Sequence, residues 1–219
     1  MNGYFNNVAK LFVKHYAENR ISYLMLLLGT FAVPILMALL TRNSFAAVSI
    51  GMTVLVFDTA YVLSLMTRDL RRQSAVILET TLPVSVGERY GFILLNSTLI
   101  TVLGFFIAYM PALAISTAVY PLDSDIAWTG ELGAYLNLRT ISSQACTHAI
   151  FLLIFLSRRS KMVIKGVIAI LLVVCVQYLI NEYVDVEWRG VTKIGINILV
   201  AVVAWVCGYF MLKRYQFKR

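Results

Sequence analysis

Six long apolar stretches constrain this chain more than any other feature of its sequence. Each approaches or exceeds the length of about 20 residues that a helix needs to cross roughly 30 Å of hydrocarbon. The stretches are continuously apolar and lack the alternation of polar and apolar residues that is typical of barrel strands. We therefore expect an all-α polytopic membrane protein with a single transmembrane domain over residues 1–219. The six expected spans cover residues 22–41, 45–66, 91–117, 141–157, 162–180 and 194–212.

Composition excludes the other classes of protein. The chain is 60% hydrophobic and 14% charged, whereas soluble domains are nearer 45–50% and about 25%. A soluble globule of 219 residues could not bury so much apolar surface in one core. Disordered segments need the opposite composition, and three cysteines are too few for a disulfide framework.

The distribution of the 19 Lys and Arg residues predicts the orientation in the membrane. Six spans place both termini on one side, and most of the cations flank the spans on that side. They are Lys10, Lys14, Arg20, Arg68, Arg71, Arg72, Arg89, Arg158, Arg159, Lys161, Lys213, Arg214, Lys218 and Arg219, against Arg42, Arg139, Arg189 and Lys193 on the other side. By the positive-inside rule, both termini are expected in the cytoplasm. Because the cations flank spans in four separate segments, no nucleic-acid surface is expected.

Residues 1–21 have the pattern of an amphipathic helix. Apolar and aromatic residues recur at spacings of three and four, namely Phe5, Val8, Leu11, Phe12, His15 and Tyr16. Such a helix is expected to lie on the cytoplasmic membrane surface, with its apolar face in the lipid and its lysines near the lipid phosphates. The alternative is a frayed tail with accidental periodicity.

The loop of residues 67–90 is more elaborate than a connector between two spans needs to be. Residues 69–81 are compatible with a helix, and Pro83 prevents that helix from continuing. Ser85 and Glu88 form the pattern of a capping box, which marks the start of a new helix. Four or five polar residues would suffice for a solvated connector. We therefore predict a short cytoplasmic helix, a proline break and a capped restart that leads into the third span. A surface helix without a partner is the alternative.

This loop resembles a known signature. The run Leu78-Glu79-Thr80-Thr81-Leu82-Pro83-Val84-Ser85, followed by Glu88-Arg89-Tyr90, resembles the sequence after the second span of ABC-2-type transporter permeases, in particular short bacterial ones. The layout of the whole chain is similar as well, with a helix before the first span, six spans and a basic tail. One departure is Val76-Ile77-Leu78-Glu79, where the family commonly has Gly-Thr-Leu-Glu.

The resemblance implies a permease subunit of an ATP-driven exporter in the bacterial cytoplasmic membrane. Residues 67–90 would then hold the coupling helix that docks on a separate ATP-binding subunit, and the permease would pair with a second copy or a paralogue. The implied coupling residues are Arg71, Arg72, Ile77, Leu78, Glu79, Leu82, Pro83, Ser85 and Glu88. The chain has no G-x-x-x-x-G-K-[ST] run. ATP and Mg²⁺ are therefore expected in the partner, and no enzymatic activity, cofactor or metal is expected in this chain.

Three polar side chains inside the expected spans are candidates for a translocation path: Asp58, Gln144 and His148. An acid at the centre of a membrane helix costs about 2.5–3.5 kcal/mol on insertion scales, so Asp58 should face a cavity or a partner. It is either a pathway group or proton carrier, or a neutral or paired carboxyl with His148 or Lys165 as partner. His148 is either part of an aqueous path along the polar outer half of span four or a hydrogen-bonded helix contact.

Other intramembrane residues are expected to pack helices together. Asn96, Gln177 and Asn197 are predicted to form hydrogen bonds between helices. A small-residue stripe repeats every fourth position of span three, at Gly104, Ala108, Ala112 and Ser116, with Pro111 as an expected kink. The stripe permits close packing either within the subunit or across a dimer.

Three other functions are alternatives to an ATP-driven permease. An intramembrane enzyme would need a nucleophile with a base, or metal ligands, and the chain has neither H-E-x-x-H nor G-x-S-x-G. A secondary transporter could use Asp58 as its proton site. A membrane assembly or sensor subunit would need no pathway at all.

Overall fold

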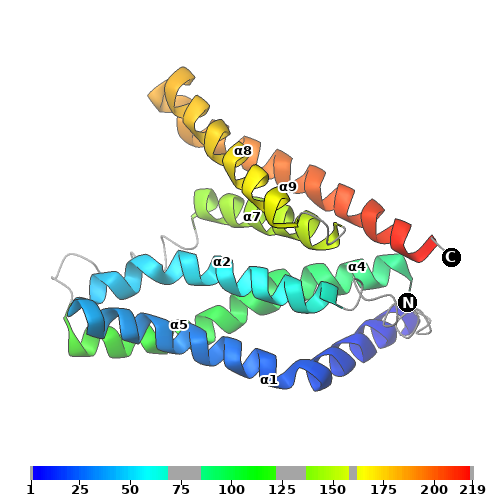
Figure 1. Ribbon diagram of the computed structural model, residues 1–219, viewed down its shortest axis with the longest axis horizontal. Helices are drawn as coiled ribbons and strands as arrows, with labels where there is room; N and C mark the ends of the chain where they lie inside the picture. Colours follow the sequence, from blue (N-terminus) through cyan, green and yellow to red (C-terminus); the bar gives the residue numbers. More distant parts are fainter. Residues whose placement is uncertain (1, 69–84, 122–136, 158–161, 218–219) are drawn as a thin grey trace. The chain divides into compact units, whose positions relative to one another are not determined.

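The computed structural model describes residues 2–68, 85–121, 137–157 and 162–217, and every regular element in these ranges is helical (Figure 1). The elements are α1 (Asn2–Thr41), α2 (Ser44–Arg68), α4 (Val86–Leu95), the π-helix η2 (Asn96–Ile100), α5 (Thr101–Val119), α7 (Leu138–Leu156), α8 (Met162–Tyr183) and α9 (Val186–Phe217). The expectation of a helical protein is confirmed for this part of the chain.

Five of the described helices are long and apolar enough to cross a membrane. They cover Ala9–Thr41, Ser44–Arg68, Val86–Val119, Leu138–Leu156 and Val186–Arg214. The first has 33 residues, or about 50 Å at 1.5 Å per residue, which exceeds the thickness of the hydrocarbon layer. Large apolar side chains on these helices are open to the surroundings: Ile107 is 72% exposed and Phe57 is 69% exposed. Lipid is the medium that suits such surfaces, so the chain is an integral membrane protein.

The helix bounds differ from the expected spans in several places. Helix α7 begins at Leu138, three residues before the expected start, because the Asn137 side chain caps it by accepting from the Thr140 backbone N–H at 2.9 Å. Helix α9 extends the expected sixth span at both ends. Helix α8 covers the expected fifth span. Within the described residues, however, its apolar stretch is Leu171–Tyr183, which is shorter than the stretches of the five candidate spans. Within the described residues the structure therefore supports five candidate spans, and the sixth expected span is not confirmed.

The chain divides into two compact units. The first comprises Met1–Val62 with Gly91–Tyr135, and the second Leu63–Tyr90 with Leu136–Arg219. Two of the three boundaries fall inside helices, one in α2 and one in α4, so each of these helices contributes to both units. The flanks of the 67–90 loop belong to the second unit. The two units are described separately below.

In the first unit, α1 packs on α5 around a core of small and aromatic side chains. Its buried members are Ala38, Ala47, Val54, Leu55, Phe105, Tyr109 and Leu113. The Tyr109 hydroxyl donates to the Ala47 carbonyl at 2.7 Å, which ties α5 to α2. The small-residue stripe contributes to this packing: Ala108, Ala112 and Ser116 are buried, and a Cβ at Gly104 would lie 3.6 Å from Leu27 of α1. Of the two alternatives, the structure shows packing within the subunit.

Helix α1 changes direction at Asn19, whose backbone dihedrals (φ −115°, ψ 15°) are not helical, and Figure 1 shows the resulting bend. The segment before the bend was expected to place its apolar face in lipid, but part of that face contacts protein. The Phe12 ring meets Phe92 edge to face at 4.7 Å between centroids, and Leu11 is buried. The expected lipid-facing orientation is therefore wrong for these side chains. The side chains of Phe5 and Val8 lie outside the described set.

Asn96 lies in span three and forms hydrogen bonds with residues on both sides of this bend. Tyr16 donates to the Asn96 side-chain oxygen, and the Asn96 amide donates to the Tyr23 hydroxyl at 2.7 Å. His15 Nε2 lies 2.9 Å from the same Tyr23 hydroxyl. Asn96 is fully buried and is the first residue of η2. The expectation that Asn96 bonds another helix is confirmed. These bonds also explain why the polar tips of the face turn to the protein, since the hydrocarbon of a bilayer offers tyrosine and histidine no hydrogen-bond partners.

In the second unit, α7 and α9 make the most extensive contact. Their core consists of Ala149, Ala201 and Ala204, with Ala145, Leu153 and Trp205 packed against it. Alanines at the contact let the two backbones approach closely, as is common between membrane helices. Helix α8 packs on both α7 and α9.

Candidate functional site

The expected coupling helix lies outside the described residues, but its exit is described. Seven of the implied coupling residues fall in the range that the structure does not describe: Arg71, Arg72, Ile77, Leu78, Glu79, Leu82 and Pro83. Ser85 and Glu88 form the predicted capping box: the Ser85 backbone N–H donates to the Glu88 carboxylate at 2.6 Å, and the Glu88 N–H donates to the Ser85 hydroxyl at 3.2 Å. Helix α4 begins at Val86. The capped restart of the helix is confirmed.

Tyr90, two residues after Glu88, connects α4 to α9. Its hydroxyl donates to the backbone carbonyl of Trp205, and its ring meets Tyr209 edge to face at 5.6 Å. Gly208 lies under this contact, and a Cβ there would come within 3.2 Å of the Tyr90 hydroxyl and 3.4 Å of Leu152. The missing side chain is what lets the tyrosine reach the α9 backbone. Tyr90 is 8% exposed, so water competes little for this hydrogen bond.

Trp205 continues the connection to α7. Its indole N–H donates to Nδ1 of His148 at 3.1 Å, and the two rings meet edge to face. His148 is buried, and a ring nitrogen that accepts a hydrogen bond carries no proton. His148 was interpreted either as part of an aqueous path or as a hydrogen-bonded contact between helices, and the structure shows the contact between helices. The result is a continuous chain of contacts, Tyr90–Trp205–His148, from the exit of the loop through α9 to α7.

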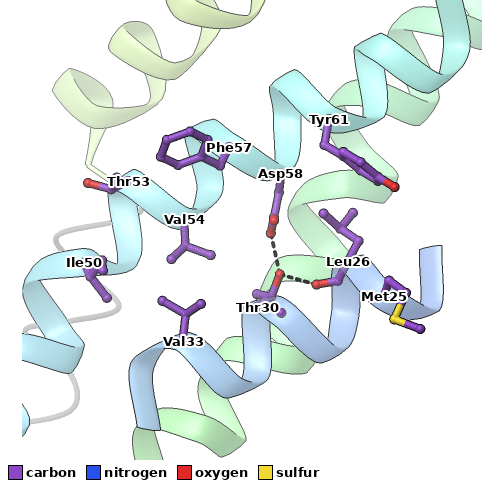
Figure 2. Close-up of a pocket in the computed structure, with 11 residues that line it drawn as sticks. Met25, Leu26, Thr30, Val33, Ile50, Thr53, Val54, Phe57, Asp58 and Tyr61 are labelled. Carbon is purple, nitrogen blue, oxygen red and sulfur yellow. Dashed lines mark hydrogen bonds between the residues drawn. The ribbon is translucent and has the colours of Figure 1, made fainter. Parts of the chain in front are cut away.

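In the first unit, Asp58 is a buried polar side chain of a candidate span. It lies on α2 and is 5% exposed, and its carboxyl Oδ2 lies 2.8 Å from the hydroxyl of Thr30 on α1. The same hydroxyl lies 2.9 Å from the Leu26 carbonyl (Figure 2). The observed partner is therefore Thr30, whereas His148 or Lys165 had been expected. His148 is bonded to Trp205, and the Lys165 side chain lies outside the described set.

The geometry around Thr30 fits a neutral carboxyl. A threonine hydroxyl has one proton and can fully donate to only one of its two oxygen neighbours. If Asp58 carries a proton, it donates to Thr30, and Thr30 donates to the Leu26 carbonyl, so that both contacts are full hydrogen bonds. A buried ionised carboxylate with one shared hydroxyl donor would be poorly compensated.

Two grooves share the Asp58–Thr30 pair as part of their walls. The α1–α2 groove has a volume of about 490 Å³ and is lined mainly by apolar side chains such as Val33, Val54 and Phe57 (Figure 2). The α1–α5 groove, of about 420 Å³, is also lined by residues of η2 and α2, and Arg20 is among its lining residues. The pair is thus a polar spot between two apolar surfaces. Its position fits a proton-carrying or helix-positioning role better than the recognition of a charged solute.

The third expected pathway residue, Gln144, is half-buried on α7, one turn before His148. The polar cleft on this helix is lined instead by Ser143 and Thr147, from another face of α7. Gln144 and His148, the two residues predicted on this helix for a translocation path, do not line that cleft. Among the residues that the structure describes, no three His, Cys, Asp or Glu side chains gather as a metal site would require.

Sequence reasoning missed Thr30, Tyr90, Trp205 and Gly208. Threonine and glycine are common in membrane helices and give no signal of their own. Tyr90 was available as part of the Glu88-Arg89-Tyr90 run, but its partner is 115 residues away. Comparison of the chain with family models, curated proteins and solved structures finds no match.

Proposed function

We propose that this chain is the permease subunit of an ATP-driven exporter of the ABC-2 type. A separate ATP-binding subunit holds ATP and Mg²⁺ and docks on the loop of residues 67–90. Two permease chains, identical or paralogous, form the translocation pathway in a bacterial cytoplasmic membrane with both termini in the cytoplasm. The supporting sequence feature is the Leu82-Pro83-Val84-Ser85 run with Glu88.

The observation that carries the proposal is the Tyr90–Trp205–His148 chain. A docked motor can drive a permease only if movement of the loop reaches the spanning helices. The capping box makes the start of α4 a defined helix end, and Tyr90 joins that end to α9 by a buried hydrogen bond. Trp205 extends the connection to α7. Such a continuous contact network is a physical route for coupling, to be tested by mutation.

The first experiment tests docking. The tagged full-length chain is purified in detergent from its own host and assayed for a bound ATP-hydrolysing subunit, and export is measured in membrane vesicles. Arg71→Glu combined with Arg72→Glu, and separately Ile77→Pro, should release the subunit and abolish ATP-driven export. Arg42→Glu reverses a charge at the opposite end of span one and should leave both intact. A bound subunit and normal export in the loop variants would refute the proposed role of the loop.

A second experiment tests transmission. Tyr90→Phe removes only the hydroxyl that donates to Trp205. We expect the ATP-binding subunit to remain bound and the amount of substrate exported per ATP to fall. Tyr183→Phe is the matched control, because Tyr183 is 81% exposed at the end of α8. Unchanged export per ATP in Tyr90→Phe would show that the Tyr90–Trp205 bond does not carry the movement.

A proton-coupled secondary transporter is the alternative that one observation favours, namely the buried Asp58 carboxyl next to two grooves. The two mechanisms differ in their energy source. Transport that persists after mutation of the ATP-binding subunit's phosphate-binding lysine, and that collapses with the proton gradient, would favour the alternative. Loss of transport in that mutant, with the gradient intact, would favour the ATP-driven exporter. A chain that supports neither kind of transport would fit an assembly or sensor subunit.

A further inference from the structure

A small polar cleft lies between α7, α8 and α9 in the second unit. Its volume is about 200 Å³. Arg139, Ser143 and Thr147 line it from α7, Val173 from α8, and Lys193 and Asn197 from α9. Pockets that enclose a drug-sized molecule measure about 300–1,000 Å³. The cleft is therefore too small for a whole amphiphile, and only part of such a molecule would fit in it.

The charges of this cleft are of one sign. Arg139 and Lys193 both line it, and no Asp or Glu does. The Lys193 ammonium donates to the side-chain oxygen of Asn181 at 2.7 Å, which fixes its direction at the end of α8. Within the part of the chain that the structure describes, neither cation pairs with a carboxylate, although Glu182, Asp185 and Glu187 lie in the same end of the second unit. Two cations that line one cleft without a counter-ion repel one another and favour an anion in that cleft.

The cleft also changes character along its length. Arg139 and Lys193 stand at the end near the start of α7, whereas Ile150 and Val173 line the cleft further along. Arg139 and Ile150 are eleven residues apart on one helix, which corresponds to about 16 Å. A ligand with an anionic head and an apolar continuation matches this order of side chains.

We propose that this cleft binds the phosphate group of an anionic amphiphile. Phosphate is the anion that a guanidinium recognises through paired hydrogen bonds, and a lysine adds a point charge that is strongly attracted to it. In a membrane, phospholipid headgroups present this group at the level where α7 begins. Free phosphate offers the same chemistry, so the two sources must be distinguished by experiment.

Binding is measured on the purified full-length chain in detergent, by native mass spectrometry and by the shift in Tm. The probes are phosphatidylglycerol, phosphatidylcholine and inorganic phosphate. We expect phosphatidylglycerol to bind in preference to phosphatidylcholine. Arg139→Gln and Lys193→Gln should each weaken this binding about tenfold, and Lys193→Arg should retain it. Val173→Phe fills the apolar part of the cleft without changing a charge and should weaken the binding as well.

Arg42→Gln is the control, because it removes one exposed cation that does not line the cleft. Equal binding in the wild type, Arg139→Gln and Lys193→Gln would overturn the proposal, as would an equal loss in Arg42→Gln. If inorganic phosphate binds in the same variant-dependent way and displaces the lipid, the phosphate site stands and its source is the free anion. The assay needs neither an ATP-binding subunit nor transport, so its failure is separate from a failure of the proposed function.

Discussion

The hydrogen bond between Thr30 and Asp58 leads to a prediction with a magnitude that distinguishes two charge states. The perturbation is a double-mutant cycle with Thr30→Val, which removes the hydroxyl at nearly constant volume, and Asp58→Ala. The two oxygens are 2.8 Å apart, and both residues are almost fully buried. The interaction energy from the cycle reports this contact alone, provided that neither variant creates new contacts.

The size of that energy depends on whether Asp58 is charged. Hydrogen bonds between helices in membranes average about 0.6 kcal/mol in such cycles and reach about 1.7 kcal/mol. A hydrogen bond to a buried charge contributes about 1.5–3 kcal/mol, and breaking a buried ion pair costs about 3–5 kcal/mol. Because the geometry around Thr30 fits a neutral carboxyl, we expect a coupling of about 0.6–1.7 kcal/mol at neutral pH.

The assay is the free energy of unfolding of the full-length chain in mixed lipid–detergent micelles. Thr59→Val serves as the control, because Thr59 is similarly buried but donates to the Leu55 carbonyl of its own helix at 2.8 Å. The control cycle of Thr59→Val with Asp58→Ala should give a coupling near zero. A Thr30–Asp58 coupling of about 2–3 kcal/mol or more would refute the neutral carboxyl, because it lies above the range for neutral hydrogen bonds between membrane helices. A coupling no larger than that of the control would mean that the contact contributes nothing to stability.

Three further predictions concern packing and capping, and each is measured as a change in the free energy of unfolding under the same conditions. Gly208→Ala should destabilise the protein by about 1–3 kcal/mol through overpacking against Tyr90, whereas Gly195→Ala on the same helix, with open space around it, should be neutral or stabilising by up to about 1 kcal/mol. If both variants behave alike, Gly208 is not needed for the approach of Tyr90. Asn96→Leu should cost about 1–3 kcal/mol, because it removes the partner of the half-buried Tyr16 hydroxyl and one of the two partners of the Tyr23 hydroxyl, and a neutral result would contradict that network. Ser85→Ala should cost about 0.5–2 kcal/mol through loss of the helix cap, and an unchanged stability would mean that the cap is dispensable.

Local features of this protein could be predicted from its sequence because the responsible atoms are close together along the chain. The apolar runs determine which segments are helical, since backbone groups in lipid must be satisfied within the helix. The capping box follows from two side chains three residues apart, Ser85 and Glu88. The start of α7 at Leu138 was missed by three residues, although Asn137 could have indicated it as a cap.

Contacts between distant parts of the chain could not be predicted. Asp58 needs a partner, and the sequence offered His148 and Lys165 because they are ionisable. The observed partner is Thr30, which is 28 residues away and has no distinguishing signal. The outcome depends on how α1 and α2 are rotated about their axes, and apolar sequences constrain that rotation weakly.

The N-terminal segment shows a second reason why the sequence did not predict the packing. Its amphipathic pattern correctly marked one face as special, but an apolar stripe with aromatic residues suits either lipid or protein. The polar tips of Tyr16 and His15 were the signal that protein was the better medium. Tyr16 needs a buried amide on another helix, which Asn96 supplies, and His15 lies within hydrogen-bond distance of the Tyr23 hydroxyl that the same amide contacts.

The π-helix η2 has a consequence for how span three serves its neighbours. One extra residue in a helical turn is equivalent to a single-residue insertion, and it rotates everything on one side of it by about 100° relative to an unbroken α-helix. Before η2, the helix presents Phe92 to the first segment of α1, and after it the same helix presents Phe105 and Tyr109 to the core. One helix can therefore satisfy two packing patterns that a single α-helical register would not align. Deletion of one residue within Asn96–Ile100 would restore a regular helix, and only one of the two patterns could then be kept.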